Sequence, residues 1–325
     1  MQTGDLAEDL AERLRAAGSG KRAIGEKAYL KSDLDFCGVT VVETRRIVRE
    51  ALRAQRGFDR AAPLALVETL WRESVHELRV AVYEALDVRG ALLLAEDLTL
   101  IERLLRESKT WALVDGLAEH VAGGLVERFP ALNCTLDRWA MDADFWLRRA
   151  ALLALLRPLR RGAGDFDRFA GYADAMLEER EYVIRKAIGW ALREVAKQRP
   201  DLVAAWLAPR THRRSGVTLR EAVKYLPAGR REALLAAFTA SSHCEQCEPA
   251  ARPLRIASTR TQPLQPPARA ASAVGSDGQG MVAVATPASR ALPDRTRTQA
   301  SRAGRGRARR ACPSPGSRAS SPSAG

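Results

Sequence analysis

Apolar residues recur at helical spacing throughout residues 1–240. Leucine and alanine are interspersed there with arginine and glutamate, and no segment keeps the strict apolar–polar alternation that is typical of a β-strand. Short glycine or proline breaks divide the region into segments of ordinary helix length. The breaks lie at Gly57, Pro63, Gly90, Gly123, Gly124, Pro130, Gly162, Pro200, Pro209, Gly216 and Pro227. The pattern predicts an all-α fold.

The helical segments are copies of one another. Four of them share an aliphatic residue, an arginine, a variable residue and an alanine in that order. These copies are Leu78–Ala81, Leu147–Ala150, Ile184–Ala187 and Leu219–Ala222, and a related copy begins at Arg45. The arginines of the last three copies are 37 and 35 residues apart. Two-helix repeats of this length stack into an α-solenoid with a concave inner face, and the HEAT-like class matches the period best.

One face of the repeat helices is predicted to be basic. With the arginine as position 0, positions 0, +1, +4 and +5 share one side of a helix, and the other side is apolar or small in most copies. Over six copies the first side holds ten basic residues against four acids, whereas an ordinary solvated face would mix the two signs. It also holds Tyr83, Trp111, Trp190 and Tyr225. A basic concave face with aromatics is expected of a nucleic-acid backbone site, and its candidate contacts are Arg45, Arg79, Arg148, Arg185 and Lys186.

One copy departs from this pattern. The interval between Arg79 and Arg148 leaves room for a further repeat, in which Trp111 stands at the arginine position and Asp115 follows one turn later on the same face. A lone acid in a cationic stripe allows two interpretations. Either Asp115 balances a neighbouring arginine while Trp111 packs in the core, or the pair is placed for chemistry.

The net charge of +13 is mostly a property of the C-terminal tail. Residues 241–325 hold 13 arginines, no lysine and four acids, so residues 1–240 carry a surplus of only +4. The tail has no aromatic residue and only three leucines, and such a composition predicts a disordered segment. We therefore expect a folded domain over 1–240 and a disordered tail over 241–325. The basic segment 302–310 is either a non-specific nucleic-acid arm or a solvated extension, and composition favours the second.

The sequence shows no pattern for a metal or membrane site. His243, Cys244 and Cys247 form half of a zinc-type motif, but no second ligand pair lies at a suitable spacing. The five cysteines are scattered, and neither a signal peptide nor an apolar run of membrane-spanning length is present. We expect a cytoplasmic monomer, nucleoid-associated when it acts on DNA, without a metal or other cofactor and without membrane contact.

Four segments resemble the AlkD-type DNA alkylation repair enzymes, which are DNA glycosylases built from HEAT-like repeats. The resemblance covers roughly residues 25–235. Its marks are Tyr29–Gly38, Ser108–Asp115, Trp146–Arg149 and Ile184–Glu194. Two positions depart from the family, which often has a second tryptophan before Trp111 and an aspartate after it, whereas this chain has Thr110 and Ala112.

The resemblance implies a function and a set of site residues. The function is hydrolysis of the N-glycosidic bond of N3- and N7-alkylated purines in double-stranded DNA. Asp115 is implied as the catalytic carboxylate, and Trp111 and Trp190 as aromatic walls for the lesion nucleotide. Arg149 is implied as a phosphate-side contact, and Tyr29 as a further residue of the same cleft.

The residue types suit this reaction. A cationic alkylpurine is already a good leaving group, so no general acid is needed, and a carboxylate would stabilise the oxocarbenium-like sugar and position water. No motif marks a lysine of the stripe as a nucleophile, which favours a monofunctional glycosylase. Most glycosylases flip the base into a deep pocket, but a shallow concave groove suggests that this type need not, and the resemblance implies the same. Two alternatives remain: a non-catalytic HEAT-like protein that binds bent or branched DNA, and a protein–protein scaffold, against which the basic face argues. The remaining tryptophans, Trp71, Trp139, Trp146 and Trp206, are expected to pack between helices.

Overall fold

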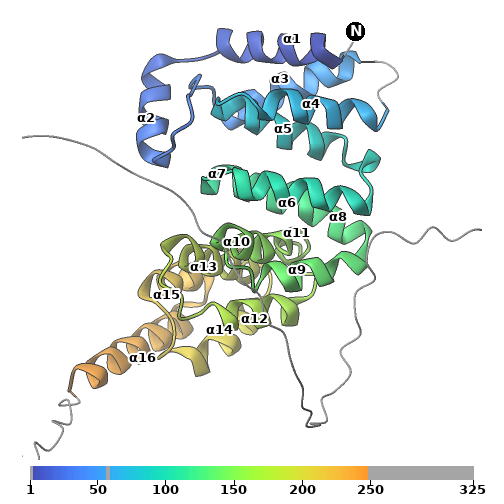
Figure 1. Ribbon diagram of the computed structural model, residues 1–325. Coiled ribbons are helices and arrows are strands. Elements are labelled where there is room, and N and C mark those ends of the chain that lie inside the picture. Colours follow the sequence, from blue (N-terminus) through green and yellow to red (C-terminus); the bar gives the residue numbers. More distant parts are fainter. Residues whose placement is uncertain (1–2, 56–58, 248–325) are drawn as a thin grey trace, which may run out of the picture. The chain divides into compact units, whose positions relative to one another are not determined.

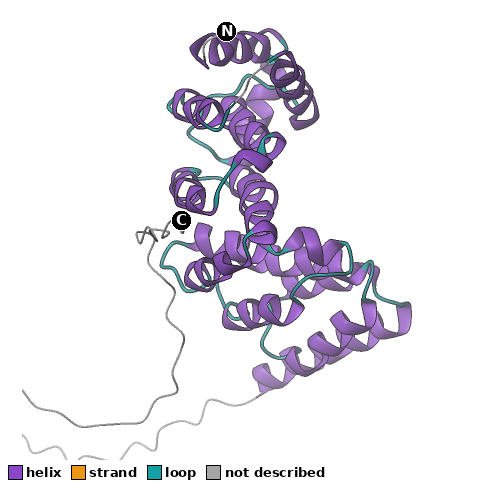
Figure 2. Cartoon of the chain, turned by 90° about the vertical axis from the view of Figure 1, so that its right-hand side faces the viewer, coloured by secondary structure: helices purple, strands orange, loops and turns teal. Residues whose placement is uncertain are grey.

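The computed structural model describes residues 3–55 and 59–247, and this part of the chain is helical (Figure 2). It contains no β-strand, only one isolated bridge between Asp35 and Val75. The predicted all-α class is therefore confirmed. No helix in the described ranges combines the length and the apolar character that a membrane span requires.

The α-helices follow one another along the chain with short connections (Figure 1). They are α1 (Thr3–Ala16), α2 (Gly20–Leu30), α3 (Val41–Ala54), α4 (Ala61–Trp71), α5 (His76–Val88), α6 (Leu98–Glu107), α7 (Trp111–Gly116), α8 (Gly123–Arg128), α9 (Asn133–Trp139), α10 (Phe145–Ala154), α11 (Leu156–Arg160), α12 (Phe166–Ala175), α13 (Tyr182–Ala196), α14 (Pro200–Leu207), α15 (Gly216–Ala222) and α16 (Ala228–Cys247). The shorter elements are η1 (Gly90–Leu92), η2 (Ala95–Asp97), the π-helical turn η3 (Leu117–Ala122), η4 (Pro130–Leu132), η5 (Ala208–Arg210) and η6 (Val223–Tyr225).

The repeat copies form one continuous row of helices. The six copies lie on α3, α5, α7, α10, α13 and α15, and each of these helices packs against the next. In α3, Thr40 caps the N-terminus by accepting the Glu43 amide at 3.1 Å, and the buried residues Thr44, Ile47, Val48, Ala51 and Leu52 recur at helical spacing. A helix inside the row has neighbours on several sides, so α5 buries most of its circumference.

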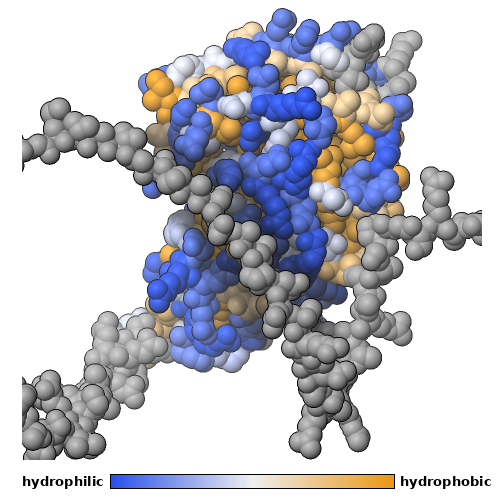
Figure 3. Space-filling view, in the orientation of Figure 1, coloured by the Kyte–Doolittle hydropathy of each residue, from blue (hydrophilic) through white to orange (hydrophobic). Residues whose placement is uncertain are grey.

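This packing narrows the basic face that the sequence predicts. Positions +4 and +5 were expected to be exposed, but Tyr83, Glu84 and Leu152 at those positions are buried. Adjacent helices of the row cover them, because a helix that packs on two neighbours exposes a narrower arc than an isolated one. Hydrophilic side chains still gather on the face shown in Figure 3, interrupted by apolar patches.

The end of the described chain bears on the predicted domain boundary. Helix α16 continues through residue 240 and ends at Cys247. Residues 248–325, with the basic segment 302–310, lie outside the described residues. The division at residue 240 and the disorder of the tail therefore stay predictions.

Candidate active site

A cavity of about 930 Å³ is lined by residues of the repeat row and of α2. Its aromatic residues are Tyr29, Trp111, Trp146, Tyr182 and Trp190. Its charged residues are Lys31, Lys109, Arg149, Lys186, Arg193, Glu221 and Lys224. Three of the six cations, Arg149, Arg193 and Lys224, are paired with acids. The other three favour an anionic ligand, and the aromatic residues offer stacking surfaces.

The structure brings together half of the predicted site residues. Tyr29, Trp111, Arg149, Lys186 and Trp190 all line the cavity. Asp115 is not a lining residue, but it is bound directly to Arg149, which is one. The prediction from the sequence missed Lys31, Lys109 and Tyr182, although both lysines lie inside the segments that carry the resemblance.

Asp115 on α7 and Arg149 on α10 form a bidentate ion pair. The Arg149 Nε donates to Asp115 Oδ1 at 2.7 Å, and Nη2 donates to Oδ2 at 2.8 Å. The third guanidinium nitrogen, Nη1, donates to the Val183 carbonyl. The Arg149 side chain is only 5% exposed and that of Asp115 is 16% exposed. Arg149 thus orients the carboxylate, and its predicted contact with phosphate stays a prediction.

Burial and charge act on Asp115 in opposite directions. Desolvation raises the pKa of Asp115 above its ordinary value, and the charge of Glu119 adds to this effect. The positive charge of Arg149, its hydrogen bonds and the charge of Lys186 act to lower the same pKa. The result is a poorly hydrated carboxylate whose charge is matched by a rigid guanidinium, a setting in which electrostatic interactions are strong.

A close helix contact fixes the position of Asp115. A Cβ atom on the next residue, Gly116, would lie 2.6 Å from Cε1 and Cζ of Tyr83, so the Tyr83 ring packs directly against the α7 backbone. Tyr83 is buried, and burial raises its pKa. The π-helical turn η3 begins at Leu117, directly after α7, and such turns often lie at functional sites.

The aromatic residues of the cavity come from four helices, α2, α7, α10 and α13. The rings of Tyr29 on α2 and Trp111 on α7 meet edge to face, with centroids 5.9 Å apart. Trp190 follows Gly189, where α13 approaches α15 so closely that a Cβ would lie 2.8 Å from the Thr218 carbonyl oxygen. The glycine therefore sets the distance between these two helices and, with it, the place of Trp190.

Trp146 is a lining residue that the sequence assigned to helix packing. The other three tryptophans of that prediction, Trp71, Trp139 and Trp206, are buried as expected. Trp146 is partly buried and lies on Phe145, with ring centroids 4.5 Å apart, at the start of α10. Its presence in the motif Trp146–Arg149 was the sequence feature that could have identified it as a cavity residue.

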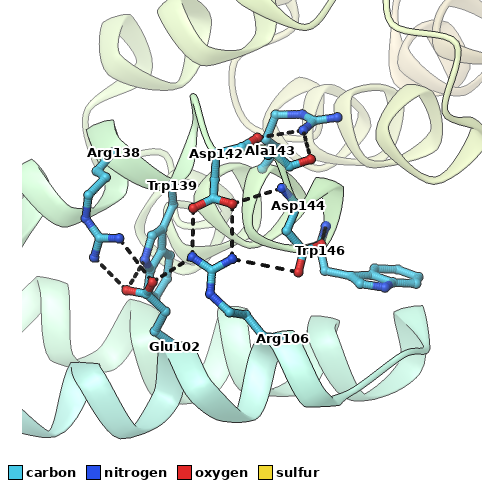
Figure 4. A network of polar contacts seen from close by, with 9 residues as sticks. Glu102, Arg106, Arg138, Trp139, Asp142, Ala143, Asp144 and Trp146 are labelled. Carbon is cyan, nitrogen blue, oxygen red and sulfur yellow. Dashed lines mark hydrogen bonds and ion pairs between the residues drawn. The ribbon is translucent and has the colours of Figure 1, made fainter. Parts of the chain in front are cut away.

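A network of charged side chains holds the start of α10 (Figure 4). Asp144 caps the helix by accepting the Trp146 amide at 2.9 Å, and Asp142 accepts the Asp144 amide at 2.9 Å. Arg106 binds both oxygens of Asp142, at 3.1 and 2.8 Å, and also Glu102 at 2.9 Å. The network fixes the start of α10. It thereby sets the positions of Trp146 and of the arginines of this helix.

The four arginines predicted to form a DNA-facing stripe are engaged within the protein. Arg45 pairs with Glu84 through two hydrogen bonds of 2.8 Å, and Arg148 pairs with Glu179 at 2.7 and 2.9 Å. Arg185 donates to the Glu179 carbonyl at 2.6 Å. Arg79 lies over the Trp71 ring at 4.9 Å and donates to the Glu107 carbonyl. None of the four lines the cavity, and their bonds tie adjacent elements together.

A buried glutamate holds the loop that carries α2. Helix α2 has no buried residue of its own, although it supplies Tyr29 to the cavity. The Glu77 carboxylate accepts the backbone amides of Cys37, Gly38 and Val39 at 2.9, 2.6 and 3.2 Å. The loop that follows α2 is thereby fixed to the start of α5.

We expect Glu77→Ala to lower the free energy of unfolding by about 1.5–3 kcal/mol, because two of the three amides are buried and would lose a charged acceptor. Urea denaturation measures the change. The matched control is Glu73→Ala, whose exposed carboxylate lies 3.8 Å from Arg15, with an expected cost of about 0–1 kcal/mol. Equal stabilities of the two variants would contradict the assigned role of Glu77.

Within residues 3–55 and 59–247, no group of three or more His, Cys, Asp and Glu side chains could hold a metal ion. His243, Cys244 and Cys247 lie in α16, but their side chains are outside the described part of the structure.

The chain is similar to known proteins over most of its helical part. A family model described as DNA alkylation repair enzyme matches residues 10–226, more than half of the chain. A solved structure described as a predicted DNA alkylation repair enzyme from Enterococcus faecalis is 22% identical, with a TM-score of 0.56, and the match covers 65% of this chain and 97% of that one. AlkD2 from Streptococcus mutans is 18% identical, with a TM-score of 0.47, over 63% of this chain and 100% of that one. No curated protein matches the sequence.

Proposed function

The chain belongs to the DNA alkylation repair enzyme family, and on that premise we propose that it is a monofunctional DNA glycosylase. Its substrates would be cationic N3- or N7-alkylated purines in duplex DNA, released by hydrolysis of the N-glycosidic bond. The observation that carries the proposal is the Asp115–Arg149 pair beside an aromatic cavity with a cationic lining.

The reaction requires stabilisation of a cation rather than proton donation to the base. As the glycosidic bond of an N-alkylated purine breaks, the base departs neutral and positive charge moves to the sugar. A preorganised carboxylate near that charge lowers the barrier, and this is the role proposed for Asp115. Indole faces attract a nearby cation by about 0.5–2 kcal/mol, so Trp111, Trp146 and Trp190 suit the walls of the sugar and lesion site.

The place of Asp115 supports an electrostatic role. Its carboxylate is held by both nitrogens of one edge of Arg149, behind the residues that line the cavity, and keeps 16% exposure. A nucleophile would need direct contact with the sugar carbon, whereas a charge can act without such contact. Water then supplies the hydroxyl group. The cavity is rimmed by Tyr29 and Tyr182, which are 70% and 58% exposed, so we propose that the lesion is not enclosed in a deep pocket.

One observation favours the second candidate function, non-catalytic recognition of bent or branched DNA. Asp115 is absent from the cavity lining and its oxygens are bound by Arg149, which is also the geometry of a structural ion pair. The two functions differ in one measurable respect, which is the release of a base.

The deciding experiment incubates the purified full-length protein with duplex DNA that contains 7-methylguanine and measures the free base. We expect release from this cationic lesion and none from a duplex with uracil, whose neutral base is a poorer leaving group. Binding of both duplexes is measured in parallel. Strong binding of duplex DNA without release of 7-methylguanine would leave only the non-catalytic function.

We expect removal of residues 248–325 to change the excision rate by less than about twofold, because every residue of the proposed site lies before α16 ends. The cut after Cys247 keeps α16 whole. Excision of 7-methylguanine by the shortened and full chains at the same salt concentration measures the effect. A much larger loss would show that the basic tail works as a DNA-binding arm.

A further inference from the structure

Two lysines of the cavity occupy an unusual backbone conformation. Lys31 and Lys109 are the non-glycine residues of the described chain with positive φ, at 50° and 53°. Lys31 is the C-cap of α2, and Lys109 lies two residues before α7. Residues with a Cβ disfavour the left-handed region, and helix ends of this kind usually carry glycine or asparagine. A lysine at both positions points to a use for the side chain.

The two lysines are close in the sequence to the two rings of one aromatic contact. Lys31 follows Tyr29 by two residues and Lys109 precedes Trp111 by two, and the two rings meet at 5.9 Å. Both lysines are exposed and both line the cavity. Two segments that are distant in the sequence thus bring positive charges to the same cavity.

These charges are not neutralised within the protein. Neither Lys31 nor Lys109 forms an ion pair with any residue of the described chain, and the same holds for Lys186 on α13. Lys186 is exposed and lines the cavity, with Nζ 6.0 Å from the Tyr182 ring centroid, and its charge acts on Asp115. Lys224, by contrast, is bound to Glu221 at 2.7 Å.

We propose that Lys31, Lys109 and Lys186 bind the backbone phosphates of duplex DNA around the proposed lesion site. This set shares only Lys186 with the candidate contacts that the sequence predicted for the basic stripe. The arginines tie helices together, and unpaired lysines from three separate elements contact the strand. This inference rests on the proposed function for the identity of the ligand, since phosphates of a nucleic acid are the anions that a row of unpaired cations beside stacking surfaces fits best.

The backbone conformation supplies a clean test. In Lys31→Gly and Lys109→Gly the charge is removed while the left-handed backbone becomes unstrained, so both variants should melt at the same temperature as the natural protein or higher. Lys186→Gln removes the third charge. Loss of DNA binding in a variant that is at least as stable as the parent cannot be a folding defect.

Affinity for a fluorescent duplex of unmodified DNA is measured between about 50 and 200 mM salt. We expect each substitution to reduce the slope of log affinity against log salt by about 0.9, and all three together by about 2.7. Lys31→Arg and Lys109→Arg keep the charge and should keep the slope. The control Arg72→Ala removes an exposed arginine outside the cavity that forms no ion pair within the described residues, and it should leave the slope unchanged.

Excision of 7-methylguanine separates this inference from the proposed function. Wild-type excision together with unchanged slopes in the three lysine variants would overturn the inference and leave the glycosylase proposal standing. Absence of excision together with reduced slopes would support the lysine site and reject the glycosylase. An equal loss in Arg72→Ala would show a general charge effect and would also overturn the inference.

Discussion

Asp115→Asn is expected to lower the single-turnover rate of 7-methylguanine excision by about 10²- to 10³-fold, with little change in affinity for duplex DNA. The amide has nearly the shape of the carboxylate but no charge to stabilise the oxocarbenium-like sugar. Its Oδ1 can still accept the hydrogen bond from Arg149 Nε, whereas its Nδ2 is a donor and cannot replace the bond from Nη2. The rate is measured with protein in excess over DNA, which separates chemistry from product release.

The matched control for this substitution is Asp174→Asn. Asp174 also forms a bidentate pair with an arginine, Arg210, at 2.5 and 2.7 Å, but neither residue lines the cavity. We expect this variant to excise at the wild-type rate. An Asp115→Asn protein that excises as fast as Asp174→Asn would show that Asp115 is a structural partner of Arg149 and not a catalytic residue.

The pH dependence of excision is a second test of the role of Asp115. Burial raises the pKa of Asp115, and the charged form is the one proposed to act, so excision should fall as the pH decreases through that raised pKa. The acid limb should therefore lie above the pKa of about 3.9 of an exposed aspartate. Because the folded-state pKa is the higher one, the contribution of Asp115 to stability is full below the unfolded pKa and is lost as the pH rises through the folded one. Both effects should be absent in Asp115→Asn.

Much of the fold could be predicted because its signals are local and repeated. A helical period and a glycine or proline break are properties of a few consecutive residues, and six copies of one register made the row of helices from α3 to α15 recognisable. The spacing of Trp111 and Asp115 likewise needs only one helix. The motif residues of the cavity followed from resemblance.

Ion pairing could not be predicted in the same way. The register placed Arg45 and Glu84 on one face as if they were independent, but Glu84 lies on the adjacent helix and binds both Nε and Nη2 of Arg45. A helical angle tells which side a residue occupies, but not which side chain of the next repeat stands opposite. For the same reason, the prediction from the sequence overestimated how much arginine charge is exposed. It also overlooked Lys31 and Lys109, because the composition of the chain does not reveal a left-handed backbone.

Arg149→Ala is expected to have the largest effect on stability, a loss of about 3–5 kcal/mol in the free energy of unfolding. The substitution leaves the Asp115 carboxylate poorly hydrated and without its guanidinium, and it also removes the donor to the Val183 carbonyl. The pKa of Asp115 should then rise further, because the opposing charge and hydrogen bonds are gone. Excision should fall as well, because Asp115 loses the guanidinium that orients its carboxylate.

The double variant with Asp115→Asn tests this explanation. If the cost of Arg149→Ala arises from an unpaired buried charge, then removing that charge should return part of the lost stability, and the double variant should lose less than the sum of the single ones by about 0.5–3 kcal/mol. Urea denaturation of the four proteins measures this coupling. Arg46→Ala is the control for an exposed arginine, bound to Glu43 and Glu50 and 53% exposed, with an expected loss of about 0–1 kcal/mol.

Arg149→Lys separates charge from geometry. Lysine keeps the positive charge near Asp115, but it cannot donate to both carboxylate oxygens and the Val183 carbonyl from one planar group. We expect its stability to lie between those of the wild type and Arg149→Ala, and its excision rate to be closer to that of the alanine variant. Because catalysis by a preorganised charge depends on where the charge is held, a lysine variant with full activity would mean that the orientation of Asp115 does not matter. In that case the role of Arg149 would be reduced to neutralising a buried acid.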